Sequence, residues 1–307
     1  MEEQKNTWFA FDTVNTVSFF YPNSEPIKDL LEISRRSERF FNKFREGSDI
    51  WNINHAHGHP VRVSGATEDI IRLACRYSVL TDGAFDISIG SVNWLWDFKS
   101  ELPSVPDMDS LTRCAQKVNF RQIQIGDGFV QVPEGMQLDL GGIAKGYIAD
   151  RMADCLRGYG VCSGMLNLGG NVFVIGDKPD GSHWQVGIRS PANPEDGLCA
   201  VLFVSDSSIV TSGIYERSFQ LDGACLHHIL NVHTGEPIQN DIASVTVVSS
   251  TSAYGDALST ASICLGMEES ISCLKHIPDV EALFVSRSGK QIWTGDPACY
   301  QSLEQQK

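Results

Sequence analysis

The sequence has little of what a membrane or a nucleic-acid partner requires. Its 307 residues include no apolar run close to the roughly 18 residues of a membrane-spanning helix. The N-terminus lacks the basic and apolar regions of an export signal and has no lipid-accepting cysteine. We therefore expect a protein that neither enters nor spans a membrane and that works in the cytoplasm, although a chain trimmed of its export signal would look the same.

Basic residues are also scarce, with 24 Lys and Arg against 38 Asp and Glu, which gives a formal net charge of -14. Affinity for nucleic acid rests on cationic side chains that neutralise phosphates, so we expect no nucleic-acid partner and only small nucleotides as ligands. The nine cysteines are odd in number and form no C-x-x-C pair. They are expected to be reduced core residues.

What the chain does have is apolar periodicity of both kinds, and 42% of its residues are hydrophobic. Helical patterns cover residues 27–45 and follow Thr67 and Gly255, while short strands with short connections dominate the second half. Such connections favour antiparallel neighbours, so the predicted class is α+β, with mixed or antiparallel sheets flanked by helices. No linker, repeat or low-complexity stretch divides the chain, which predicts a single domain over 8–299 and a frayed polar tail over 300–307.

One stretch, Leu138 to Asp150, reads L-D-L-G-G-I-A-K-G-Y-I-A-D. An apolar run, a Gly pair and an amphipathic pattern in succession predict a strand, a tight turn and a helix start. Unpaired N–H groups and a partial positive charge at a helix N-terminus suit a phosphate, and Lys145 falls in the first turn, where a cation needs something negative nearby. The alternative is an ordinary strand-to-helix connection with a solvent-facing lysine.

A second helix start carries oxygen ligands. After Gly255 the apolar stripe places Asp256 and Thr260 on one flank, one helical turn apart. A carboxylate and a hydroxyl aimed at one point suit Mg²⁺, a hard cation that completes its shell with water and substrate phosphates. The plainer alternative has Asp256 as a helix-start residue and Thr260 bonded to its own backbone.

Four weaker signals accompany these stretches. Residues 211–217 (T-S-G-I-Y-E-R) place hydroxyls, a glycine and an arginine in a turn that suits an anion. The His pair ahead of the Thr-Gly turn at 234–235 is either catalytic or satisfied within the core. Residues 83–86 (G-A-F-D) could wrap a planar ligand or simply pack. The loop over 55–59 has three histidines at spacing two, as in a metal site, but its Gly and Pro neighbours argue against one.

Seven motifs occur in a fixed order along nearly the whole chain, roughly residues 8–290: S-D-I-W-N-I-N, D-G-A-F-D-I-S-I-G, D-L-G-G-I-A-K-G-Y-I-A-D, L-N-L-G-G-N, T-S-G-I-Y-E-R, H-H-I-L-N-V-H-T-G and D-A-L-S-T-A. This set resembles the ApbE-type FAD:protein FMN transferases. The resemblance implies a single α+β domain of T-fold-like architecture that binds FAD and Mg²⁺. It also implies that FMN is moved onto a Thr or Ser of an acceptor flavoprotein, with release of AMP.

The resemblance also assigns residues, position by position. It implies a catalytic His228 as general base, with Lys145 near the pyrophosphate. The implied metal ligands are Asp256, Thr260 and the backbone carbonyl of Ala144. The implied FAD-binding residues are Asn54, Ala84, Phe85, Asp86, Gly141, Lys145, Tyr147, Thr211, Arg217 and Leu230.

The chain departs from the family pattern in three places. The family reads I-D-P-x-T-G after its His, whereas residues 230–235 read L-N-V-H-T-G; Asp12-Thr13 stands for Gly-Thr, and no Pro occurs around 90–92. These changes leave the FAD and metal positions intact but bear on the orientation of His228 and on the acceptor side. Two alternatives stay open: an FAD pyrophosphatase that yields FMN and AMP, and a non-catalytic flavin-binding protein.

Overall fold

The computed structural model describes residues 2–98, 104–221 and 224–303. The helices are α1 (Glu25–Phe41), α2 (Asp49–Asn54), α3 (Gly65–Leu80), α4 (Gly90–Asn93), α5 (Met108–Ala115), α6 (Ala144–Gly158), α7 (Ser252–Leu265) and α8 (Met267–Leu274). The strands are β1 (Glu2–Ala10), β2 (Thr13–Tyr21), β3 (Val61–Arg62), β4 (Gln124–Gly126), β5 (Phe129–Gln131), β6 (Gly164–Leu168), β7 (Asn171–Ile175), β8 (Trp184–Ser190), β9 (Asn193–Val204), β10 (Ser208–Gly213), β11 (Ser218–Leu221), β12 (Ala224–His227), β13 (Ile242–Ser249), β14 (Val280–Ser286), β15 (Gln291–Trp293) and β16 (Tyr300–Ser302).

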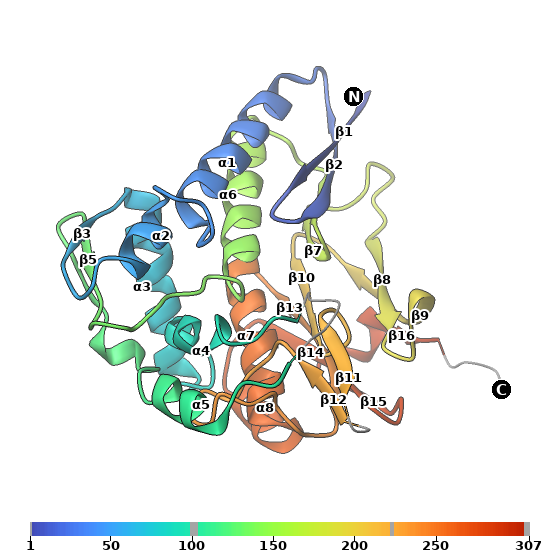
Figure 1. Ribbon diagram of the computed structural model, residues 1–307. Helices are drawn as coiled ribbons and strands as arrows, with labels where there is room; N and C mark the ends of the chain where they lie inside the picture. The colour runs from blue at the N-terminus through green and yellow to red at the C-terminus, as the bar shows by residue number, and fades with distance from the viewer. Residues whose placement is uncertain (1, 99–103, 222–223, 304–307) are drawn as a thin grey trace.

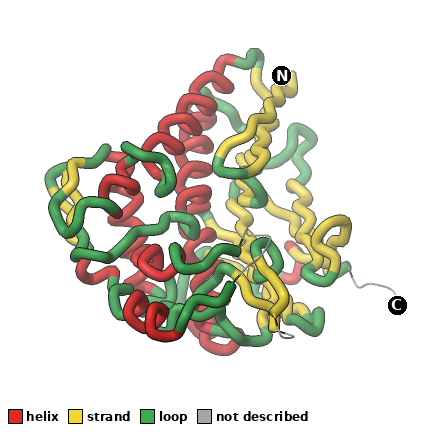
Figure 2. Tube along the Cα trace, viewed as in Figure 1, coloured by secondary structure: helices red, strands yellow, loops and turns green. Residues whose placement is uncertain are grey.

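Eight of these strands form the central sheet, in the order β1-β2-β6-β7-β10-β13-β14-β15, and every neighbouring pair is antiparallel. Helices α1, α6 and α7 lie on one side of this sheet, and the smaller sheet β16-β9-β8 lies on the other (Figure 1). Figure 2 shows the same division between helices and strands. The predicted α+β class with antiparallel sheets flanked by helices is confirmed.

The middle of the sheet shows how both layers are held. All eight residues of β13 are buried. Val245 and Val247 pack in one apolar cluster with Leu258 of α7, whereas Val248 packs in another with Leu202 of β9. A strand covered on both faces has no solvent side, so even Ser244, Thr246 and Ser249 of β13 are buried. This packing fixes the position of α7 against the sheet.

The N-terminal region differs from its sequence pattern. Residues 8–20 mix aromatics with Val and Thr and predict one strand, but β1 and β2 form a hairpin that pairs up to Ala10 and Thr13. The turn residues Phe11 and Asp12 have φ of 57° and 58°, as the tight turns that match strand twist require. The prediction missed this turn because it contains neither glycine nor asparagine.

Helix boundaries also shift from those predicted. The pattern over 27–45 predicts a helix, and α1 does place Pro26 in its first turn, but it ends at Phe41. The helix predicted to start after Thr67 is α3, and its cap is Ser64, whose Oγ accepts a hydrogen bond from the Thr67 N–H at 3.2 Å. The cap therefore lies three residues earlier than Thr67. Both Ser and Thr are good N-cap residues, and only the backbone conformation at each position decides which of them caps the helix.

Two further segments depart from expectation. Residues 138–140 form no strand; they run as an extended segment into α6. At the other end, Tyr300 of β16 pairs with Leu202 of β9, so the tail predicted to fray is ordered up to Leu303, while 304–307 lie outside the described residues. No helix in the described part of the chain is both long and apolar enough to cross a bilayer.

The cysteines are free, as predicted, but most of them are not core residues. All nine carry unpaired thiols. Cys199 is buried, Cys162 is exposed, and the other seven are half-buried. The thiols therefore line the edges of the core more than they fill it.

Candidate active site

The site begins where the N-terminal ends of α6 and α7 meet. Gly146 permits this approach, because a Cβ on it would lie 2.3 Å from the carbonyl oxygen of Ser252. Asp150 then caps α7: its Oδ1 accepts from the Ser252 N–H at 2.6 Å and its Oδ2 from the Ala253 N–H at 2.9 Å. Burial raises the pKa of Asp150 to about 6 in spite of these bonds. The two helices therefore start side by side.

Asp256 is the buried charge at this junction. It is only 4% exposed, and its Oδ2 accepts a hydrogen bond from the Gly146 N–H at 3.0 Å. Burial raises the pKa of Asp256, although Lys145, Gly146 and Asn171 each act to lower it. Within the described residues its carboxylate forms no ion pair, so a bound cation would relieve the cost of burying it.

The Gly141–Gly142 turn reaches the same point. Neither glycine has a positive φ, so the pair is not used for the backbone conformations that the sequence suggested. Gly142 is needed for space: a Cβ there would lie 3.1 Å from Phe85 Cε2 and 3.4 Å from Thr260 Oγ1. The turn, Phe85 and Thr260 therefore meet.

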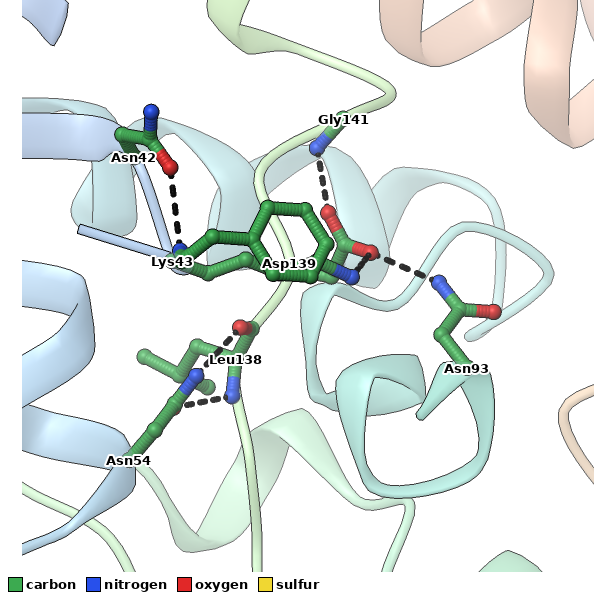
Figure 3. Close-up of polar contacts among 8 residues, drawn as sticks. Asn42, Lys43, Asn54, Asn93, Leu138, Asp139 and Gly141 are labelled. Carbon is green, nitrogen blue, oxygen red and sulfur yellow. Dashed lines mark hydrogen bonds and ion pairs between the residues drawn. The ribbon is translucent and has the colours of Figure 1, made fainter. Parts of the chain in front are cut away.

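A polar cluster that sequence reasoning missed holds this turn in place (Figure 3). The Oδ2 of Asp139 accepts from Lys43 Nζ at 2.6 Å and from Asn93 Nδ2 at 2.8 Å, and its Oδ1 accepts from the Gly141 N–H at 2.8 Å. Burial would raise the pKa of Asp139, but the Lys43 ammonium and the other donors outweigh it and lower the pKa. Asp139 thus ties the turn to two segments distant in sequence.

Asn54 and Asp86 support the backbone of the site. The Nδ2 of Asn54 donates to the carbonyl of Leu138 at 3.0 Å and its Oδ1 accepts from the Leu138 N–H at 2.7 Å, as Figure 3 shows. The carboxylate of Asp86 is buried and accepts from Ser88 and from the Phe120 N–H. Both residues are predicted to bind FAD, but in the structure their side chains form hydrogen bonds with neighbouring residues of the protein.

His228 carries an unused nitrogen. Its Nδ1 is buried and has no partner in the described structure, while its backbone N–H donates to the Arg217 carbonyl at 3.1 Å. Burial, together with the charges of Arg217 and Lys145, lowers the pKa of His228 to about 4. Its imidazole is neutral at pH 7 and able to accept a proton. Lys145 acts on both His228 and Asp256, which places all three in one electrostatic environment.

Thr211 points away from this site, and its neighbour Ser212 takes the place expected for it. The Oγ1 of Thr211 lies 2.8 Å from that of Thr246 in β13. The neighbours of Thr246 along the strand, Val245 and Val247, pack on α7, so Thr246 lies on the opposite face of the sheet. Successive side chains of a strand point to opposite faces, and Ser212 Oγ lies 3.3 Å from Thr260 Oγ1. The motif therefore reaches the site through Ser212, and the side chain of Thr211 lies on the other face of the sheet.

Three other predicted residues pack within the protein. Leu230 is 3% exposed and lies in an apolar cluster with Val92 and Trp96. Tyr147 packs edge-on against Phe41, with ring centroids 5.8 Å apart. Ala84 packs against the main core cluster. Any contact that these residues make with a ligand is through what little of them stays exposed, including backbone atoms.

The donor set fits a hard cation that shares its shell with a ligand. The described residues contain no group of three His, Cys, Asp or Glu side chains placed to hold a metal, and His55 of the His-rich loop stacks on Trp51. One buried carboxylate, one hydroxyl and the first carbonyl of α6 are oxygen donors, and too few to complete a shell. The N-cap residue of α6, Ile143, offers no side-chain cap. Asp256 takes the Gly146 N–H and the Leu140 carbonyl takes the Ala144 N–H, so it is the positive end of the helix, with Lys145 in its first turn, that suits an anion such as a pyrophosphate.

The antiparallel fold, with a site suited to a phosphate-bearing ligand beside a hard cation, points to one class of protein. The chain belongs to the ApbE family, whose family model matches residues 11–284.

Relatives agree with this assignment. A protein of Klebsiella pneumoniae (strain 342) named FAD:protein FMN transferase is 37% identical over 84% of this chain and 81% of its own length. A protein of the same name from Treponema pallidum (strain Nichols) is 34% identical over 84% of this chain and 76% of its own. Among solved structures, the ApbE protein of Thermotoga maritima has a TM-score of 0.87 at 28% identity, covering 95% of this chain and 97% of that one. The flavinyl transferase ApbE of Pseudomonas stutzeri has a TM-score of 0.85 at 25% identity, covering 95% and 94%.

Proposed function

We propose that this chain transfers FMN from FAD to a Thr or Ser hydroxyl of an acceptor flavoprotein and releases AMP. Family membership and relatives named FAD:protein FMN transferase support the proposal. The observation that carries it is the meeting of Lys145, the N-terminal end of α6 and the buried carboxylate of Asp256, which accepts from the Gly146 N–H. This arrangement suits a pyrophosphate held together with a hard cation.

The protein's own residues account for the steps. His228 takes the proton of the acceptor hydroxyl as its oxygen bonds to the phosphorus of the FMN moiety. The bond from that phosphorus to the bridging oxygen breaks, and its electron pair leaves with AMP. Lys145 and the positive N-terminal end of α6 stabilise the charge that grows on the pyrophosphate oxygens. Mg²⁺ held by Asp256, Thr260 and the Ala144 carbonyl would neutralise pyrophosphate charge.

Two broader features remain proposals. Nine free thiols are typical of a reducing compartment and support a cytoplasmic location. Cell fractionation with an antibody to the chain tests this, and recovery from the cell exterior would contradict it. The domain predicted over 8–299 is proposed as the catalytic unit.

One assay separates the proposed function from its alternatives. The protein is incubated with FAD, MgCl₂ and a Thr-bearing acceptor flavoprotein domain, and both free AMP and the acceptor mass are measured. AMP with an FMN-sized mass gain is expected. AMP without a mass gain would indicate a pyrophosphatase, and bound FAD without AMP would indicate a carrier. The acceptor with its Thr changed to Val is the control and should gain no mass.

Variants at two residues then test the chemistry. Asp256→Asn removes the charge and should lower the transfer rate by about 100-fold at fixed MgCl₂. His228→Gln should slow transfer by roughly 100- to 10,000-fold while FAD binding, followed by flavin fluorescence, stays unchanged. His233→Gln, an exposed histidine of the same motif, is the matched control. Full activity of Asp256→Asn or of His228→Gln would rule out the role given to that residue.

A further inference from the structure

Three hydroxyl groups join β10 to α7 beside the proposed cation site. Ser212 Oγ lies 2.8 Å from Ser259 Oγ and 3.3 Å from Thr260 Oγ1. The Oγ of Ser259 in turn donates to the carbonyl oxygen of Asp256 at 3.1 Å. Ser259 is fully buried and Ser212 is half-buried, so water competes little for these bonds.

The direction of each bond follows from counting protons. A hydroxyl has one proton to donate, and a carbonyl oxygen only accepts. The proton of Ser259 goes to the Asp256 carbonyl, so the bond between the serines must use the proton of Ser212. With that proton committed, the bond to Thr260 must use the proton of Thr260, and Ser212 accepts it.

We infer that Ser212 is a positioning residue that fixes the proton of Thr260 and thereby presents the Oγ1 lone pairs of Thr260 to the cation. The inference rests on the cation of the proposed function. A hydroxyl binds a metal through a lone pair, so its proton must point elsewhere. Ser212 supplies the acceptor that holds it there.

Without Ser212 the proton of Thr260 has a competing partner. A Thr within a helix can donate to the carbonyl four residues earlier, which here belongs to Asp256. That bond would turn the lone pairs of Thr260 to a different direction. Loss of a partner that orients a metal ligand commonly weakens metal binding by about 10- to 100-fold. Ser212→Ala should therefore weaken Mg²⁺ binding by about tenfold.

The matched control is the next residue of the same strand. Thr211→Val also removes one hydroxyl, but that group lies against Thr246 on the other face of the sheet. Binding of Mg²⁺ is measured by titration calorimetry of MgCl₂ into the full chain saturated with ADP, which carries a pyrophosphate but no flavin. We expect the dissociation constant of Thr211→Val to stay within about twofold of the unmodified chain while that of Ser212→Ala rises. The Tm of each variant reports on folding.

A second variant tests the order of the chain of hydroxyls. Ser259→Ala leaves Ser212 in place to accept the Thr260 proton, so its loss of Mg²⁺ affinity should be smaller than that of Ser212→Ala. The double variant should bind Mg²⁺ no more weakly than Ser212→Ala alone, because the residues act in series. Additive losses would contradict the series.

The remaining outcomes are separable. Equal dissociation constants for Ser212→Ala and the unmodified chain would overturn the inference and leave the proposed function standing. An equal loss in Thr211→Val would also overturn it, since the effect would then follow any hydroxyl lost from β10. If the unmodified chain bound no Mg²⁺ with ADP present, the cation of the proposed function would fail, and the inference with it.

Discussion

The neighbours of His228 set the pH at which this single residue can accept a proton. Burial and Arg217 together hold its pKa at about 4, below the ordinary 6.5. A protonated imidazole accepts no proton, so kcat/KM for transfer should fall as the pH drops through about 4. Arg217→Gln removes one cause of the shift, so the pKa rises and the acid limb of the profile should move to higher pH.

The measurement is kcat/KM for transfer from about pH 3 to pH 8 at saturating MgCl₂. Arg35→Gln is the control, because it removes an exposed arginine from α1, a helix distant from β11 and β12 in Figure 1. An acid limb that stays in place in Arg217→Gln would show that Arg217 does not act on the base. If the acid limb of the unmodified chain lay near pH 6.5, the ordinary pKa of histidine, the burial of His228 would be contradicted.

Single residues were predictable where local periodicity fixes direction. Helical spacing placed Asp256 and Thr260 on one flank, and the structure brings Thr260 to Gly142 and Asp256 to Gly146. Strand direction was not predictable, since which face of β10 meets α7 depends on tertiary packing, and so Thr211 was chosen over its neighbour.

Partners far apart in sequence could not be found at all. Asp139 lies within a quoted motif, yet Lys43 is 96 residues away and Asn93 is 46 residues away. No local pattern links such residues, because their contact depends on how the segment after α1 and the end of α4 pack around the turn.

At the scale of elements, the spacing between α6 and α7 depends on one missing side chain. A Gly→Ala change inside a helix usually stabilises by about 1 kcal/mol. At Gly146, however, the added Cβ would lie 2.3 Å from the Ser252 carbonyl, so the helices must separate. We expect Gly146→Ala to lower the free energy of unfolding by about 1 to 3 kcal/mol, as overpacking does.

The same helix supplies the control. Gly158 ends α6, and a Cβ there would meet no atom within 4 Å. Gly158→Ala should leave the free energy of unfolding unchanged or raise it by up to about 1 kcal/mol. Both variants are compared by urea denaturation monitored by circular dichroism. Equal stabilities would show that α6 and α7 have room to adjust.

For the whole molecule, composition and periodicity predicted the class but not the topology. Many short strands with short loops indicated antiparallel sheets, and the central sheet is antiparallel throughout. The order of the strands could not be predicted, because β2 pairs with β6, a strand far away in sequence, with Asn15 opposite Leu168. Helices α1 to α6 are inserted between these two strands, and only the apolar core on the helical side of the sheet brings them together.

The stability of the whole fold should fall in acid because of His227. This residue is 0% exposed, its Nε2 lies 2.9 Å from the Ile238 carbonyl, and burial lowers its pKa from 6.5 to about 4. Between these values the unfolded chain binds the proton and the folded chain does not, so unfolding is favoured as the pH falls. The full shift corresponds to about 3 kcal/mol.

Urea denaturation at pH values from 7 to 4 measures this loss. His227→Gln keeps a donor for the Ile238 carbonyl but cannot titrate, so its stability should fall less steeply than that of the unmodified chain. The difference between the two slopes isolates His227 from the opposing effect of Asp150, whose pKa of about 6 favours the folded state as carboxyl groups become protonated. Parallel curves for the two proteins would show that His227 is not held neutral by burial in the folded state.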